Sequence, residues 1–248
     1  MALSTRKAAC FLGPAALLLL ASAASAGTRS DTSSRPGGWI EAARGSVDKA
    51  SWISELTSTL RVPSAPRYGG QVLYLFSALQ PAAGSNVGKI IQPVLQYDSE
   101  GWSIASFSVE DGEATHSAFV RTAPGHTISG SMKGSACNAQ GVCTWTITTS
   151  DRTSGETTTL TVHDTVAYGR YYAGVVEAYG ITSCSEYPGD GFVRFEHVTV
   201  RDQNGELLEA APELWVDDEV APQCGFGARA PAQDAVSLFF DRGCPAGC

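Results

Sequence analysis

Hydrophobic and polar residues alternate along much of the chain, in short segments separated by turn-forming residues. This period of two, with many β-branched and aromatic residues, predicts strands with one buried face. Helical periodicity is almost absent, and only Glu206–Leu214 has room for a turn of helix. Strands are expected at Trp39–Ala43, Ala50–Val62, Gln71–Ala78, Lys89–Tyr97, Trp102–Glu110, Thr115–Thr122, Thr127–Lys133, Cys143–Ser150, Glu156–Thr165, Tyr171–Ser183, Gly191–Asp202 and Ala235–Phe240. Many short strands at this spacing predict an all-β sandwich or barrel.

Two polar side chains interrupt otherwise apolar strands. Glu177 lies in an uncharged stretch and, by alternation, shares a face with Val175, Tyr179 and Ile181. A carboxylate there is costly unless it is paired, hydrogen-bonded or protonated, and burial raises its pKa into the range useful for acid–base catalysis. Gln92 interrupts a second apolar run. We ask whether the two residues face the same space.

The N-terminus has the features of a secretory signal peptide. Arg6 and Lys7 precede the apolar run Ala8–Leu20, and Ala24–Ala26 provides a small-x-small cleavage signal. The expected organisation is a signal peptide at 1–26, a flexible linker or short pro-segment at 27–38, a β-domain at 39–242 and a C-terminal cysteine ring at 243–248. A removable signal predicts a secreted, extracellular protein that is not held in a membrane after cleavage.

The cysteines agree with an oxidising compartment. Removal of the signal leaves six, an even number, and the competing zinc site lacks both a C-x-x-C motif and paired histidines. Fifteen pairings are open to six cysteines. We expect Cys137 with Cys143, stapling a hairpin, Cys184 with Cys224, and Cys244 with Cys248.

The formal net charge is −8 and the isoelectric point is near 5.0. An acidic chain without a Lys/Arg cluster argues against nucleic acid or an anionic membrane as partner. The length of the mature chain suits one large β-domain, expected to be a monomer.

Most familiar catalytic motifs are absent. The chain has no Gly-x-Ser-x-Gly elbow, no His-Glu-x-x-His and no P-loop, so no metal or other cofactor is expected. His163-Asp164 could be half of a triad, but two polar residues at a strand end are the simpler interpretation. Two acidic clusters, 110–113 and 217–219, could supply paired carboxylates for glycoside hydrolysis, although acidic clusters at turns are usually solvated surface.

Several short motifs, in order, resemble the glutamic peptidases of the eqolisin type, which are secreted acid proteases. The similarity spans roughly residues 38 to 202, including a Thr/Ser-rich stretch at 127–165. Its motifs are Gly38-Trp39-Ile40, Thr59–Ala65, Ile90–Tyr97, Val175-Val176-Glu177 and Gly191–Phe195. Gly174 and Gln96 stand where the family has a tryptophan and an aspartate.

The resemblance implies a fold, a reaction and residue roles. The fold would be an antiparallel two-sheet β-sandwich, a jelly roll of the concanavalin A type. Glu177 would act as general base and then general acid, and the Gln92 amide would orient the water and donate to the oxyanion. Trp39, Gln96 and Tyr179 would contact a protein or peptide substrate. The alternative is a non-catalytic sandwich of the same architecture that binds glycans or a cell-wall polymer.

Overall fold

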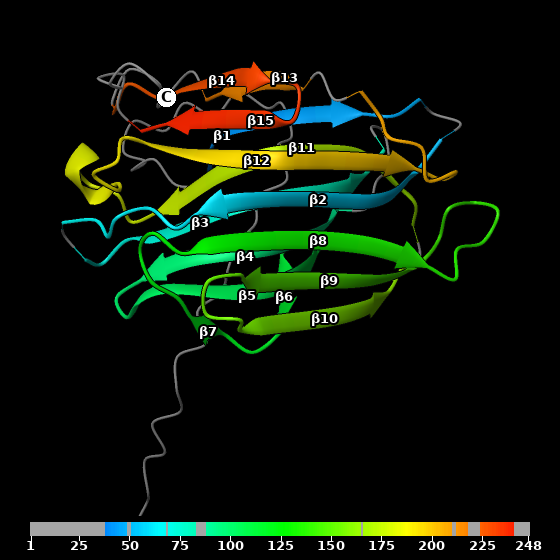
Figure 1. Ribbon diagram of the computed structural model, residues 1–248, viewed down its shortest axis with the longest axis horizontal. Coiled ribbons are helices and arrows are strands. Elements are labelled where there is room, and N and C mark those ends of the chain that lie inside the picture. Colours follow the sequence, from blue (N-terminus) through cyan, green and yellow to red (C-terminus); the bar gives the residue numbers. More distant parts are fainter. Residues whose placement is uncertain are drawn as a thin grey trace, which may run out of the picture.

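The chain folds into two antiparallel sheets that lie one behind the other in the computed structural model (Figure 1). The structure describes residues 38–48, 51–67, 69–82, 88–164, 166–209, 212–217 and 224–240. Its strands are β1 (Gly38–Ser46), β2 (Ile53–Arg61), β3 (Val72–Pro81), β4 (Lys89–Asp98), β5 (Gly101–Glu110), β6 (Glu113–His116), β7 (Val120–Arg121), β8 (Thr127–Ser135), β9 (Thr144–Asp151), β10 (Thr157–His163), β11 (Tyr168–Tyr179), β12 (Phe192–Asp202), β13 (Glu213–Val216), β14 (Gly227–Ala232) and β15 (Ala235–Phe239). A short 3₁₀ helix, η1 (Cys184–Glu186), follows β11. The prediction of an all-β, antiparallel two-sheet sandwich is confirmed.

The eight-stranded sheet has one face toward the other sheet and one face turned away from it. The eight-stranded sheet has the order β13-β1-β11-β3-β4-β5-β6, with β7 beside β5, and the seven-stranded sheet has the order β10-β9-β8-β2-β12-β15-β14. Two apolar clusters combine residues of both sheets and form the core between them. A third cluster draws only on the eight-stranded sheet and its edge strands. It therefore lies on the side of that sheet turned away from the core, which we call the outer face.

A bulge in β11 adapts this strand to the core. The pairing of β11 with β3 shifts between Tyr172 and Val175, and Gly174 lies within the shift. A Cβ at Gly174 would approach the Phe195 ring to 2.4 Å, so only glycine fits against this ring. Gly174 thus allows β11 to lie close to the opposing sheet.

The expected strands are largely present, with several corrections. The expected strand Thr115–Thr122 is divided between β6 and β7, and β14 was not expected from its Gly, Ala and Pro content. The turn of helix expected within Glu206–Leu214 is wrong, because Leu207 bridges to Arg201 and β13 pairs with β1. The strand expected to run on to Ser183 ends at Tyr179, since Gly180 has a φ of +71°.

Two disulfides confirm two of the expected pairings. Cys137 is bonded to Cys143, and Cys184 is bonded to Cys224 across 40 residues. The expected signal peptide, the linker up to residue 37 and the ring of Cys244 and Cys248 lie outside the described residues. In the part of the chain that the structure describes, no helix combines the length and apolar character that crossing a bilayer requires.

Candidate functional site

Glu177 lies on the outer face of the eight-stranded sheet. Its neighbours Val176 and Ala178 are in the core between the sheets, whereas Val175 is in the outer cluster. Alternation therefore directs the Glu177 side chain outward with Val175 and Tyr179. The expectation for Ile181 is wrong, because Ile181 is in the core beyond the turn at Gly180.

The Glu177 carboxylate is largely shielded from water by aromatic residues. Only 8% of the residue is exposed. The Tyr179 hydroxyl donates a hydrogen bond to Oε1, and the Trp39 side chain also donates to the carboxylate from the paired position on β1. Burial raises the pKa of Glu177, and the two hydrogen bonds only partly offset this effect. The raised pKa expected from the sequence is confirmed.

The charge of the Glu177 carboxylate also affects a tyrosine on the neighbouring strand. Tyr74 of β3 pairs with Glu177 of β11, and the centroid of its ring lies 6.2 Å from that of Tyr179. Burial, followed by the negative charges of Glu177 and Asp98, raises the pKa of Tyr74 to about 12. The phenol therefore stays protonated wherever Glu177 titrates, and it can serve as a hydrogen-bond donor on this face.

Gln92 lies on the same outer face. Its alternating neighbours on β4, Ile90 and Val94, belong to the outer cluster, and Gln92 itself is 7% exposed. Pro93 points the other way, toward Gly130 of β8, where a Cβ would come within 2.5 Å of the proline ring. The contact of Pro93 with Gly130 therefore holds β4 close to the seven-stranded sheet at the position of Gln92.

The strand register defines how the two residues are offset. Glu177 pairs with Tyr74 of β3, and Tyr74 pairs with Gln96 of β4. Gln96 is therefore the β4 residue that is level with Glu177 across the sheet. Gln92 lies on this same strand, two strands across from Glu177, and four residues before Gln96. Gln96 donates from Nε2 to Asp98 Oδ2 at 2.8 Å.

Another pair of side chains on this face has the same offset. Phe107 pairs with Gln92, so it lies two strands across and four residues along from Tyr74, in the same direction. The ring centroids of Tyr74 and Phe107 are 6.4 Å apart. The contact shows that two side chains at this offset on the outer face can reach one another.

The predicted substrate contacts differ in their surroundings. Trp39 packs edge-on against Tyr172 at 4.8 Å and Phe76 at 5.7 Å, in addition to bonding Glu177. Tyr179 holds the carboxylate directly. The sequence alone does not indicate that Trp39 and Tyr179 bond the Glu177 carboxylate, nor that Tyr74 lies beside it. The aromatic residues at alternate positions of β3, Tyr74 and Phe76, were the feature of the sequence that could have indicated it.

The histidine candidate from the sequence does not form half of a triad. His163 Nδ1 contacts Thr144 Oγ1 at 2.9 Å, whereas Asp164 accepts from the Tyr168 hydroxyl and pairs with Lys89. The dyad that the structure does contain joins residues distant in sequence. His126 Nδ1 donates to Asp151 Oδ2 at 2.7 Å, and Asp151 is fully buried.

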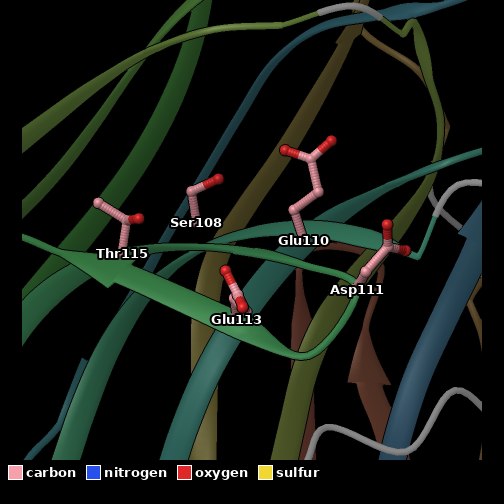
Figure 2. A pocket seen from close by; sticks show the side chains of 5 residues that line it. All are labelled: Ser108, Glu110, Asp111, Glu113 and Thr115. Atoms are coloured by element: carbon pink, nitrogen blue, oxygen red, sulfur yellow. The ribbon is translucent and has the colours of Figure 1, made fainter.

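The acidic cluster of the β5–β6 hairpin lines a pocket of about 460 Å³. Figure 2 shows its five side chains, Ser108, Glu110, Asp111, Glu113 and Thr115. Glu110 bonds the Lys89 ammonium at 3.2 Å, and both Glu110 and Glu113 are exposed. Exposed carboxyls lack the desolvation that a glycosidase general acid requires. Among the described residues, no group of three acidic, histidine or cysteine side chains is arranged to hold a metal ion.

The fold is similar to that of known peptidases, although sequence comparison finds no relative: no protein-family model matches the chain, and no curated protein matches it significantly. A crystal structure of scytalido-glutamic peptidase with a peptide-based transition-state analogue superposes with a TM-score of 0.59 at 13% identity, covering 82% of this chain and 98% of that one. SCP-B, a member of the eqolisin family of peptidases, in complex with the tripeptide Ala-Ile-His, gives 0.52 at 14% identity, covering 82% and 96%. The chain therefore has the fold of the glutamic peptidases.

Proposed function

We propose that this protein is a secreted acid endopeptidase of the glutamic type, in which Glu177 and Gln92 activate a water molecule. The observation that carries the proposal is a shielded carboxyl of raised pKa that shares the outer face with an uncharged amide two strands away. An amide beside a carboxylate adds donor and acceptor capacity without charge repulsion. The fold shared with glutamic peptidases supports the same reaction.

The proposed reaction has two proton transfers. Glu177 takes a proton from the water as its oxygen attacks the peptide carbonyl, and the Gln92 amide donates to the oxygen that gains negative charge. Glu177 then gives the proton to the leaving nitrogen as the C–N bond breaks. The products are a carboxylic acid and an amine, and Glu177 returns to its starting state.

The surrounding residues prepare Glu177 for both roles. Burial favours the protonated acid, whereas the Tyr179 hydroxyl and the Trp39 side chain favour the carboxylate. A carboxyl balanced in this way can both accept and donate a proton in the acid range. Trp39, Gln96 and Tyr179 remain our candidates for contacts to the substrate backbone.

The test is cleavage of a denatured protein at acid pH by the purified mature chain. Glu177→Gln and Gln92→Ala should each lower kcat by about 10²–10³-fold or more. Glu206→Gln, a change at an exposed turn residue of the other sheet, is the matched control and should retain full activity. Full activity in both site variants would refute the assignment. Absence of cleavage together with binding on a glycan array would instead favour the glycan-binding alternative.

A further inference from the structure

An aromatic cluster stands on the outer face directly beside Gln92. Phe107 of β5 pairs with Gln92 on one side and with His116 of β6 on the other. The Phe119 ring completes the cluster, with its centroid 4.8 Å from that of His116 and 5.9 Å from that of Phe107. The cluster thus extends from Gln92, across β5, to the edge strand β6.

The three rings differ in exposure. Phe107 is buried beneath the other two, whereas Phe119 is 44% exposed. Only two other large apolar side chains among the described residues are comparably exposed, Leu207 and Leu214. Neither adjoins Gln92, because Leu207 bridges to Arg201 in the other sheet and Leu214 is on edge strand β13. An exposed aromatic ring resting on a buried one offers an apolar surface to a ligand side chain.

The proposed reaction fixes which part of a substrate would lie there. The carbonyl oxygen would face Gln92 and the leaving nitrogen would face Glu177. The acyl half of the peptide would therefore extend from Gln92 toward β5 and β6, and the amine half toward β11 and β1.

We propose that Phe107, His116 and Phe119 form a subsite that holds a large apolar side chain, such as Phe, Tyr or Leu, on the N-terminal side of the scissile bond. This inference rests on the proposed function for its orientation. The substrate class that follows is peptides with a bulky apolar residue preceding the cleaved bond.

The experiment compares cleavage of two matched peptides that carry Phe or Ala before the scissile bond. Phe119→Ser should lower kcat/KM for the Phe peptide about tenfold and leave the Ala peptide unchanged. Phe119→Leu keeps an apolar surface and should restore most of the preference. Leu207→Ser is the matched control, since it removes an exposed apolar side chain from the other sheet, and it should leave both peptides unchanged.

A binding measurement separates this inference from the proposed function. Calorimetry at acid pH with Glu177→Gln should detect tighter binding of the Phe peptide than of the Ala peptide, and Phe119→Ser should abolish the difference. Such binding without any cleavage by the wild-type chain would overturn the peptidase assignment and retain the subsite. Cleavage without a Phe preference, or with a preference that Phe119→Ser leaves intact, would overturn the subsite alone. Neither cleavage nor binding would overturn both.

Discussion

Glu41 should make the protein less stable as the pH rises. This carboxyl is fully buried on β1. Its Oε2 accepts a hydrogen bond from the Gly227 amide at 3.1 Å, and the Phe239 backbone also donates to the carboxyl. No partner for Oε1 is present among the described residues. Burial raises the pKa of Glu41 well above its ordinary value of 4.5, and the backbone hydrogen bonds only partly oppose this.

The sign and size of the effect follow from proton binding. Above pH 4.5 and up to the raised pKa of the folded state, the folded protein binds one proton more than the unfolded chain at this site. The free energy of unfolding therefore falls with pH, by about 1.4 kcal/mol per unit for one proton. Below pH 4.5 both states are protonated at Glu41, and the site contributes no slope.

Glu41→Gln removes this titration with little change of shape. The free energy of unfolding, measured by urea titration at pH 4 to 7 with the disulfides intact, should differ between wild type and variant by an amount that changes by about 1.4 kcal/mol per pH unit. Near pH 4 the two proteins should be similar, because a protonated carboxyl and an amide both donate and accept. Parallel pH curves for the two proteins would refute the buried neutral state of Glu41.

Two further changes test the outer face and its support. Gly174→Ala places a methyl group against a core ring and should cost about 1–3 kcal/mol of unfolding free energy, whereas Gly227→Ala, with open space around it, should cost less than half as much. Tyr179→Phe removes a hydrogen bond that lowers the pKa of Glu177, so the acid limb of kcat/KM should move to higher pH. Tyr172→Phe removes a hydroxyl that bonds elsewhere and should leave that limb in place, and equal shifts in both would contradict the assigned hydrogen bond.

Most strands could be predicted because their burial leaves a pattern in the sequence. Strands such as β8 and β9 bury one face, which imposes a period of two, whereas β3, β4 and β5 are buried on both faces and are largely apolar. The failures occurred where this constraint is weak. The strands β13 and β14 are short edge strands with exposed or half-buried residues, and their positions depend on partners far away in sequence. Leu207 forms only an isolated bridge, which no local pattern indicates.

The site could be predicted in part. Glu177 and Gln92 were identified as polar interruptions of apolar strands, but their shared face depends on register across three strands, which the sequence does not specify. Comparison with the family pattern alone treats Gly174 as a lost tryptophan. In the fold Gly174 packs against Phe195 in the core, and the aromatic residues of the outer face come from other positions, such as Tyr74 and Phe107.

Opposite pKa shifts inside the sandwich favour greatest stability in acid. Burial alone would raise the pKa of Asp151, but hydrogen bonds from His126, Thr122 and two backbone amides outweigh it and hold that pKa well below its ordinary value of 3.8. Asp151 therefore stabilises the fold above pH 3.8 and loses this effect as the pH falls toward its lowered pKa, whereas Glu41 destabilises the fold as the pH rises above 4.5. The effects of these two groups together favour stability in mild acid over neutral pH. Because Glu41 faces the core and Glu177 the outer face, Glu41→Gln should broaden the stability profile toward neutral pH without moving the activity profile.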